Sequence, residues 1–541
     1  MSMREARQST TGLMARGRAA ALARWMVALV AVIASLSLAG CAFQLPPLPE
    51  RQPSTFLAGD AGSPLALAAA APGADAALSG LALLRDPTHA LATRVMLART
   101  AQRSLDVQVY IFHPDLSGRL LMHELWRAAE RGVRVRLLID DNGSEGMDPW
   151  MQALAGHPQI EVRLFNPFAQ RSFKAMGYLT DFSRLNRRMH NKSFTADALA
   201  TVVGGRNIGD VYYGVDDTML FADLDLLALG PAARATAGNF DAYWNSTRAY
   251  PLAVLLPAVD PAALRPLQAT LADPAGDADV ARLLAELQRT PWLASPQGAF
   301  APVHWAPAQL LSDSPAKLEH GEPAATPGLR MLEPLLAWLA GARRTLDLVS
   351  PYFVPGDAGV RSLTDLARRG VKVRIVTNSL AATDVMAVHA GYAHHRRALL
   401  LAGVELYELK PDAAAGERTA RLPWRMRLAG FSAASLHGKT FLIDGQRLFV
   451  GSFNLDQRSA LLNTEMGLTV DSATITGELA QALERDLPAT AWRVVLGSDG
   501  ALEWWEQGAD GTRTLTGEPG ASLARRLGAK VLSWLPLEGL L

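Results

Sequence analysis

Two copies of one pattern of chemically active residues organise this sequence of 541 residues. Each copy holds a histidine, a lysine two positions later, an aspartate, two small residues and an asparagine. Every member of the second copy lies 247 positions after its counterpart, as from 190 to 437 and from 207 to 454. The members are His190, Lys192, Asp197, Gly204, Gly205 and Asn207, and then His437, Lys439, Asp444, Gly451, Ser452 and Asn454. A register this regular indicates a duplicated half-site.

The residue types in the pattern suit chemistry on a phosphodiester. Imidazole can attack phosphorus or move a proton near neutral pH, and an ammonium group binds a phosphate oxygen as a point charge. A spacing of two places each histidine and its lysine on one face of an extended strand. The small pairs let backbone approach a bulky anion, and each asparagine supplies an amide near a helix start. We expect two facing halves around one phosphodiester, with no metal and no cofactor.

The duplication extends beyond the pattern and predicts the fold class. Strand-like segments recur together with a helix in each half, at residues 120–131 and 360–369. This alternation predicts an α/β protein of two pseudo-symmetric lobes, each a mixed β-sheet flanked by helices, with one active site at the lobe interface. The matched segments are 103–112 with 344–353, 131–138 with 369–376, and 160–167 with 404–411.

The double pattern resembles the phospholipase D superfamily, from about Ser79 to Leu541. The context of the first copy, residues 184–194, is similar to bacterial cardiolipin synthases. Three further stretches resemble the subgroup that joins phosphatidylethanolamine and phosphatidylglycerol: 180–188, 221–228 and 534–541. The resemblance implies two phospholipase D-like lobes and phospholipid substrates at a membrane surface.

The resemblance also implies roles for the residues of the pattern. His190 is the expected nucleophile, which forms a phosphatidyl-histidine, and His437 is the expected general acid and base; the pseudo-symmetry leaves the reverse assignment open. The lysines and asparagines are expected to stabilise charge on the phosphoryl oxygens. Asp197 and Asp444 fall at hairpin turns, and we interpret them as structural charges.

One acidic residue downstream of each copy is expected to orient a histidine. A carboxylate on one imidazole nitrogen leaves the other free to react. In the superfamily such acids reach across the lobe boundary, which predicts the pairs His190–Glu465 and His437–Asp223. Asp225 competes with Asp223, but matching residues 221–224 with 463–466 favours Asp223. The alternative is that the acids form surface salt bridges.

The N-terminus resembles a lipoprotein signal. An uncharged apolar run over residues 25–40 follows several arginines and ends before Cys41, the single cysteine of the chain. The run is short for a spanning helix, so we expect a cleaved signal peptide over residues 1–40 and lipidation of Cys41. A retained N-terminal helix is the alternative, and Met14 competes with Met1 as the start. Ala42 in place of an aspartate favours the outer over the inner membrane, with the protein facing the periplasm.

The charge of the chain disfavours a nucleic-acid enzyme. The formal net charge is +1, and residues 1–40 carry five arginines against one glutamate, or +4, which leaves −3 from Cys41 onward. Nucleic-acid enzymes usually carry a clear positive excess. The alternatives to cardiolipin synthesis are phospholipid hydrolysis to phosphatidic acid, a nuclease of the same superfamily, and a non-catalytic lipid-binding lipoprotein. We expect a monomer, because one chain holds both half-sites, and no nucleic-acid partner.

The remaining segments complete the expected domain organisation. Residues 41–78 are rich in alanine, proline and glycine and indicate a flexible tether. The first lobe is expected over 79–265, with its motif region at 184–211, a connector over 266–325, and the second lobe over 326–541, with its motif region at 431–458. His389, His394 and His395 on a helical run line the substrate cleft or face solvent. The tail, 521–541, is either an interfacial segment or a helix packed on the second lobe.

Overall fold

The computed structural model describes residues 45–71, 75–171, 173–215, 220–290, 293, 303–318, 331–411, 434–508, 511–536 and 538–541. The predicted signal peptide and Cys41 lie outside the described residues. The described chain divides into two compact units. One holds Leu48–Pro167 and Asn186–Leu541, and the other holds Phe168–Leu185 with the residues up to Pro47.

The first lobe is a mixed β-sheet. Its central strands β2, β3 and β4 run parallel to one another, and the strands on either side are antiparallel, in the order β1-β8-β6-β5-β2-β3-β4-β9. The strands are β1 (Leu78–Leu84), β2 (Ser104–Ile111), β3 (Arg134–Gly143), β4 (Ile160–Phe165), β5 (Ser193–Ala196), β6 (Ala200–Gly204), β8 (Asp225–Leu229) and β9 (Ala249–Pro251).

The second lobe repeats this order strand for strand. Its sheet runs β10-β17-β16-β15-β11-β12-β13-β18, again with three parallel central strands, and then adds β19 and β20. The predicted fold class is therefore confirmed. The strands are β10 (His304–Ser312), β11 (Thr345–Val349), β12 (Lys372–Asn378), β13 (Glu405–Leu409), β15 (Lys439–Ile443), β16 (Arg447–Gly451), β17 (Met466–Asp471), β18 (Ala491–Leu496), β19 (Leu502–Gly508) and β20 (Gly511–Thr516).

Strand β10 joins the two sheets. Its first half, from His304 to Pro307, pairs with β1, and its second half, from Ala308 to Ser312, pairs with β17. The strand lies within residues 266–325, which the sequence analysis assigned to a connector. Pro307 lies inside this strand, and because a proline is unfavourable in a strand interior, the pattern of residues did not indicate a strand here. The connecting stretch therefore supplies the strand through which the sheets of both lobes form one continuous sheet.

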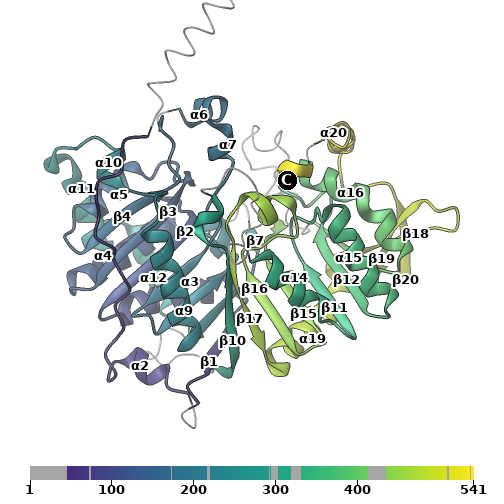
Figure 1. Cartoon of the computed structure of the whole chain (residues 1–541), viewed down its shortest axis with the longest axis horizontal. Helices are drawn as coiled ribbons and strands as arrows, with labels where there is room; N and C mark the ends of the chain where they lie inside the picture. Colours follow the sequence, from purple (N-terminus) through teal and green to yellow (C-terminus); the bar gives the residue numbers. More distant parts are fainter. Residues whose placement is uncertain are drawn as a thin grey trace, which may run out of the picture. The chain divides into compact units, whose positions relative to one another are not determined.

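Helices flank both sheets (Figure 1). The two helices predicted from the repeat are present as α4 and α15. Among the described residues, no helix has the length and apolarity needed to cross a membrane. The helices around the first sheet are α2 (Pro64–Ala68), α3 (Pro87–Thr100), α4 (Leu116–Glu130), α5 (Asp148–Ala155), α8 (Asp210–Tyr213), α9 (Pro231–Trp244), α10 (Leu252–Leu255), α11 (Pro261–Ala272) and α12 (Ala278–Leu287); those around the second are α14 (Leu332–Ala340), α15 (Gly356–Arg368), α16 (Met386–Leu401), α19 (Ala473–Thr490) and α20 (Leu523–Leu532).

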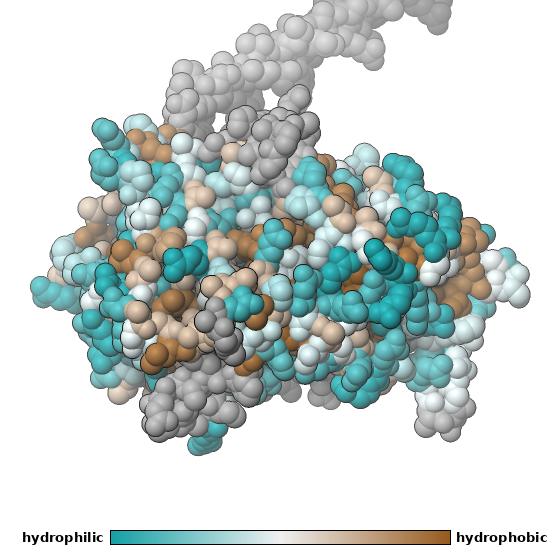
Figure 2. All heavy atoms as spheres, turned by 60° about the horizontal axis from the view of Figure 1, so that its bottom comes forward, coloured by the Kyte–Doolittle hydropathy of each residue, from teal (hydrophilic) through white to brown (hydrophobic). Residues whose placement is uncertain are grey.

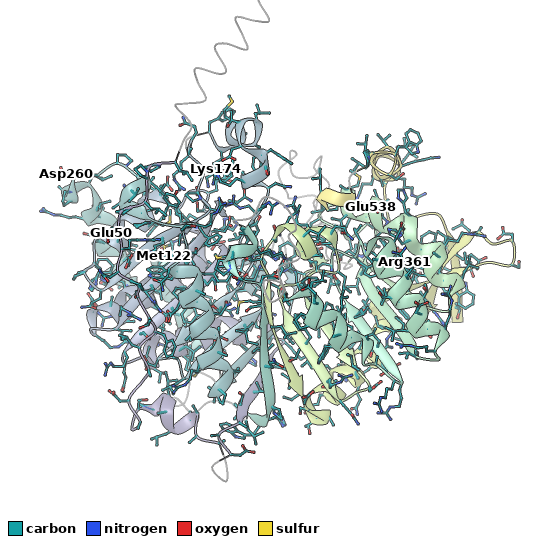
Figure 3. The ribbon with its side chains drawn as sticks, in the orientation of Figure 1. Glu50, Met122, Lys174, Asp260, Arg361 and Glu538 are labelled. Atoms are coloured by element: carbon teal, nitrogen blue, oxygen red, sulfur yellow. The ribbon has the colours of Figure 1, made fainter. Side chains whose placement is uncertain are left out.

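The described residues also form several single turns of helix. The short 3₁₀ turns are η3 (Pro274–Gly276), η4 (Pro315–Leu318) and η6 (Glu538–Leu540), and η5 (Arg458–Leu462) is one turn of π-helix. Figure 3 labels Glu538 on η6, at the end of the chain. The smaller unit contains α6 (Lys174–Thr180) and α7 (Phe182–Leu185), where the ring of Tyr178 packs against Phe168 and Phe182.

A hydrophobic core holds the two lobes together. It takes fully buried aliphatic residues from β1, β6 and β8 of the first lobe and from β15, β16 and β17 of the second, such as Val203, Leu226, Val450 and Leu468. Burial of aliphatic side chains on both sides of the interface stabilises it. The outer surface differs from this interface, because hydrophobic and hydrophilic residues are interspersed over the face shown in Figure 2.

Candidate active site

Each histidine and its lysine lie at the start of a buried hairpin strand. His190 and Lys192 lead into β5, and His437 and Lys439 open β15, so the matching hairpins of the two sheets carry them. All four side chains are buried. Lys192 Nζ donates to the backbone oxygen of His190 at 2.6 Å, and Lys439 Nζ donates to that of His437 in the same way. The i, i+2 spacing therefore places ammonium and imidazole together, as the sequence predicts.

Backbone pairing between the lobes brings each histidine to an acid of the other lobe. Met189 forms a parallel bridge with Thr464, and His190 N donates to Thr464 O at 2.9 Å. In the matching place β14 (Ala434–Leu436) pairs in parallel with β7 (Leu220–Ala222), and His437 N donates to Ala222 O at 2.8 Å. The residue after each histidine's backbone partner is the acid, so the crossing is built into the main chain.

The side chains complete the crossed arrangement. His190 Nδ1 lies 2.8 Å from Glu465 Oε2, and His437 Nδ1 lies 2.5 Å from Asp223 Oδ2. Both carboxylates are fully buried. An Nδ1–H that donates to a carboxylate leaves the Nε2 lone pair for chemistry. Each histidine therefore contacts an acid of the other lobe, as expected from the sequence. The alternative, that the acids form surface salt bridges, is wrong because both carboxylates are buried.

The sheet register distinguishes Asp223 from its competitor. Gly204 pairs with Asp225 in the first lobe and Gly451 pairs with Gly467 in the second, so Asp223 and Glu465 occupy the same position, two residues earlier. Asp225 instead forms a fully buried ion pair with Arg94 at 2.9 Å. Asp225 therefore holds the first lobe together and does not reach a histidine.

The two motif aspartates hold the hairpin turns. The Asp197 carboxylate accepts hydrogen bonds from the backbone N–H groups of residues 102–104 at 2.7–2.9 Å, at the start of β2. The Asp444 carboxylate accepts from residues 343–345, at the start of β11, in the same way. Both aspartates have φ near +55°, at 53° and 57°. They fasten each hairpin to the neighbouring strand, away from the histidines.

The small pair of each motif lies where the acid approaches the hairpin. A Cβ at Gly204 or Gly451 would overlap the adjacent strand, and a Cβ at Gly205 would overlap the carboxylate of Asp223. Ser452 occupies the matching position in the second lobe, where its Oγ accepts from Met466 N at 3.0 Å. Packing against the acid-bearing strand therefore explains these residues, in addition to the predicted approach of an anion.

The two asparagines lie before short helical turns, as expected, but are held differently. Asn207 Oδ1 accepts from Ile111 N at 3.1 Å, and its Nδ2 donates to Tyr212 Oη at 2.9 Å. Asn454 precedes η5, and its Oδ1 has no hydrogen-bond partner within the described part of the chain. Both the oxygen and the nitrogen of the Asn207 amide are thus held by the protein, whereas the amide oxygen of Asn454 is available as an acceptor among the described residues.

Aromatic residues that sequence reasoning missed surround both imidazoles. The ring of Tyr110 lies edge-on to the imidazole of His190, with 5.0 Å between the ring centroids. The ring centroids of Tyr212 and Phe221 lie 5.4 and 5.0 Å from that of His437. Tyr110 lies in the repeated segment 103–112, but its counterpart in 344–353 is Pro351, so the repeat does not single it out. These rings exclude water from the histidines and orient them.

Burial sets the protonation of the site. It lowers the pKa of His190 to about 4 and the pKa of His437 to about 3, against the opposing effect of the paired carboxylates. It also lowers the pKa of Lys192 to about 7. Burial alone would raise the pKa of Asp223 and Glu465, but the facing histidine and lysine lower both. At neutral pH the site therefore holds neutral imidazoles and ionised carboxylates.

The three histidines of α16 belong to a different part of the second lobe. His389 and His395 are buried, and their Nε2 atoms lie 3.2 Å from Glu518 and 3.1 Å from Glu538. Arg396 joins this group through Glu518 and the buried Glu408. These contacts support a structural ion network that ties the C-terminal segment to α16. His394 faces solvent, as one of the two expectations has it, whereas the buried His389 and His395 belong to the network.

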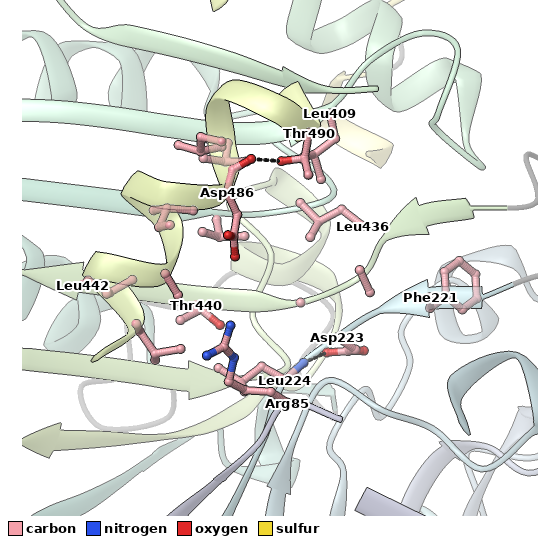
Figure 4. A pocket seen from close by; sticks show the side chains of 18 of the residues that line it. Arg85, Phe221, Asp223, Leu224, Leu409, Leu436, Thr440, Leu442, Asp486 and Thr490 are labelled. Atoms are coloured by element: carbon pink, nitrogen blue, oxygen red, sulfur yellow. Dashed lines mark hydrogen bonds between the residues drawn. The ribbon is translucent and has the colours of Figure 1, made fainter. Parts of the chain in front are cut away.

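A cavity of about 420 Å³ lies on the opposite face of β15 (Figure 4). Gly438, Thr440 and Leu442 face it, whereas His437 and Lys439 point the other way because side chains alternate along a strand. The two histidines and two lysines are absent from its lining. It is lined mainly by apolar residues from both lobes: Phe221, Ala222, Leu224, Val349, Val376, Leu409, Leu436, Leu479, Ala482, Leu483 and Leu487.

Comparison with known proteins agrees with this architecture. The family described as "Cardiolipin synthase, PLD-like domain" matches residues 96–223 and 335–487. "Cardiolipin synthase C" of Escherichia coli (strain K12) is 45% identical over 464 residues, 85% of this chain and 96% of its own length. "Cardiolipin synthase A" of Pseudomonas syringae pv. syringae (strain B728a) is 28% identical over 69% of this chain and 61% of its own length.

Among solved structures, phosphatidylserine synthase of Haemophilus influenzae Rd KW20 superimposes with a TM-score of 0.55, covering 85% of this chain and 95% of that chain at 13% identity. That likeness concerns the fold alone. Two matched segments of one family, one in each lobe, and the 45% identical relative define the class. This chain belongs to the phospholipase D-like cardiolipin synthase family.

Proposed function

We propose that the chain is a membrane-associated phosphatidyltransferase that makes cardiolipin from two phospholipids through a phosphatidyl-histidine intermediate. The observation that carries this proposal is the pair of crossed His–carboxylate hydrogen bonds, with a buried lysine beside each histidine. The 45% identical relative is a cardiolipin synthase by name, which supports the substrate class.

In the first step, His190 Nε2 attacks the phosphorus of the donor phospholipid. The bond from phosphorus to the head-group oxygen breaks, and that oxygen takes a proton from His437 Nε2 as the alcohol leaves. His437 must therefore be protonated when the donor is bound. Burial disfavours its charge in the empty site, but a bound anionic phosphodiester next to the ring favours it.

In the second step, His437 removes the proton from the hydroxyl of the acceptor, phosphatidylglycerol. The acceptor oxygen attacks phosphorus, the bond to His190 breaks, and cardiolipin is released. Glu465 and Asp223 keep the Nδ1 protons in place through both steps. Lys192, Lys439, Asn207 and Asn454 stabilise the negative charge on the non-bridging oxygens. Water in place of the acceptor would give phosphatidic acid.

The roles of the two histidines are assigned by resemblance, since each makes the same kind of Nδ1–carboxylate contact and has a lysine beside it. A radiolabelled donor, an alkaline quench and peptide mapping would locate the phosphatidyl group, with label on His190 expected. Label on His437 alone would reverse the assignment, and no label on either would remove the covalent step.

The overall reaction is tested by its products. Purified enzyme is incubated with phosphatidylethanolamine, with and without phosphatidylglycerol, beside the His437→Ala variant. Cardiolipin that forms only with wild type and only when both lipids are present supports the proposal. Phosphatidic acid as the single product under both conditions would establish hydrolysis instead.

We further propose that residues 1–40 form a cleaved signal and that lipidated Cys41 anchors the chain in the bacterial envelope, at the outer membrane facing the periplasm. Residues 41–78 act as the tether before the first lobe. Acyl labelling of wild type against Cys41→Ser, followed by separation of the two membranes, tests both statements. Unlabelled wild-type protein would contradict lipidation, and labelled protein found in the inner membrane would contradict the location.

A further inference from the structure

The C-terminal helix α20 presents its large apolar side chains to solvent. Leu523, Leu527 and Val531 are spaced by four residues and therefore share one face of the helix. They are 71%, 56% and 54% exposed, and the following Trp534 and Leu535 are 73% and 49% exposed. An apolar row of this length on a single element indicates a surface for a partner.

The opposite face of α20 packs on the second lobe through small residues. Ala529 joins a buried cluster with Leu380 and Ala521, and a Cβ at Gly528 would closely contact Met386. Arg525 fastens the helix by donating to Leu380 O at 2.9 Å and Thr383 O at 2.7 Å. The packed face thus differs from the apolar row. The helix packs on the second lobe, as one of the two expectations has it, but it does so through small residues, and its large apolar side chains face solvent.

The charges beside the apolar row are all positive. Residues 519–536 contain Arg525, Arg526 and Lys530 and no aspartate or glutamate, and the last two cations are exposed. Leucine, valine and tryptophan bordered by arginine and lysine form the pattern of a helix that lies in an anionic membrane interface. A tryptophan at the end of the row suits the head-group level, because the indole has an apolar body and a polar N–H.

The chain after α20 is tied to both motif regions. Arg458, at the first position of η5 after Asn454, donates from its backbone N to Leu541 O at 2.7 Å and from Nε to Leu540 O at 3.0 Å. The same side chain donates to Asn186, four residues before His190, at 2.7 Å. Glu538, labelled in Figure 3, binds His395 of α16. The tail that follows the apolar row therefore ends at the lobe interface that holds the site.

We propose that α20 with Trp534 and Leu535 is a membrane-docking face, which lies in the head-group region of an anionic bilayer and holds the two-histidine site against its phospholipid substrates. The proposal rests on the proposed function for its lipid substrates. Docking through this face is a property of the folded second lobe and is separate from lipidation at Cys41.

The location of the face is tested by a polarity-sensitive fluorophore. The full chain carries Cys41→Ala, so that an introduced cysteine is the only one, and NBD is attached at Leu527→Cys. The matched control is Leu67→Cys on α2, where the native leucine is 68% exposed. With vesicles of phosphatidylethanolamine and phosphatidylglycerol, we expect a blue shift and a severalfold intensity gain at position 527 and none at position 67.

Two outcomes of this experiment would overturn the proposal. One is an unchanged spectrum at position 527 while the chain sediments with the vesicles. The other is a change at position 527 that requires added protein from a membrane extract, because the face would then bind a protein rather than lipid. A smaller response with phosphatidylcholine vesicles is expected, since the exposed cations then lack anionic lipid.

Activity gives an independent measurement. Leu527→Glu/Val531→Glu is expected to lower turnover of vesicle lipid at least tenfold, while turnover of a short-chain phospholipid below its micellar concentration stays within twofold of wild type. Leu67→Glu should change neither. Equal loss on both substrate forms would contradict membrane docking. Absence of any turnover in wild type would instead refute the proposed function and leave the fluorescence experiment to decide docking.

Discussion

The two halves of the site make the same hydrogen bond with different residues. In the first lobe the acid is the short Asp223 and the hairpin residue beside it is Gly205; in the second lobe the acid is the longer Glu465 and the hairpin residue is Ser452. A Cβ at Gly205 would overlap the Asp223 carboxylate. The side chain of Ser452 is accommodated in the second lobe, where its Oγ hydrogen-bonds to the backbone of Met466. The pseudo-symmetry therefore covers the backbone and the histidines, and each lobe has its own packing around the acid.

Loss of either histidine should have the largest effect and should be equal in the two lobes. His190→Ala and His437→Ala are each expected to lower kcat by 10³-fold or more, because each ring performs a step that the other cannot perform at the same moment. The measurement is cardiolipin formation, with circular dichroism and thermal unfolding as controls for the fold. Activity within about tenfold of wild type in either variant would contradict shared catalysis, since this is only about 1.4 kcal/mol of barrier.

Exchanging the residue types of Gly205 and Ser452 should lower kcat by different amounts in the two lobes. Gly205→Ser is expected to lower kcat by about 10²-fold, because its side chain must displace the Asp223 carboxylate that orients His437. Ser452→Gly removes only a hydroxymethyl group that bonds to Met466, so we expect a change within about fivefold. Steady-state kinetics of the two single variants gives the answer, and equal losses would show that the packing difference has no functional consequence.

The pH dependence should reveal the lysine of the first lobe. Burial lowers the pKa of Lys192 to about 7, so its ammonium loses the proton, and with it the charge that binds phosphate, as pH rises through that value. We expect kcat/KM to fall more steeply above this point than below it, by a further factor of about ten per pH unit, since kcat/KM reports groups of the free enzyme and the protonated fraction of His437 already declines with pH. Lys192→Arg should be slower but keep its rate to higher pH. A profile that is flat up to pH 9 in wild type would exclude this role.

The smallest effects should come from the hairpin turns. Gly445 has φ 65° and Ala198, in the matching turn, has φ 52°, a region where L-residues with a Cβ are strained. No atom lies within 4 Å of a Cβ built at Gly445, so Gly445→Ala tests conformation alone. We expect a loss of about 1 kcal/mol in the free energy of unfolding for Gly445→Ala. Ala198→Gly should cause no loss, and urea unfolding measures both.

Much of the fold could be predicted because the repeat carries local signals. The Asp444-Gly445 turn, the i, i+2 spacing of histidine and lysine, and helices α4 and α15 all depend on short-range preferences of the chain. Strand β10 escaped prediction because Pro307 and a mixed pattern of exposure disguise it, and only pairing with β1 and β17 makes it a strand. Tyr110, Tyr212 and Phe221 were missed because aromatic residues near a strand usually belong to a core.

The sequence by itself determined which residues are available for chemistry: two histidines, two lysines and two asparagines at a fixed register, together with the candidate acids Asp223, Asp225 and Glu465. The family resemblance predicted which acid pairs with which histidine, but only the tertiary structure brings these residues into contact, and only it decided which side of α20 faces outward. The reason is physical. Glu465 lies 275 residues beyond His190 and Asp223 lies 214 residues before His437, so their contacts depend on how the lobes pack. The buried side of a helix likewise depends on the surface that competes for it, and on α20 that surface accepts Gly528 and Ala529 and leaves the leucines outside.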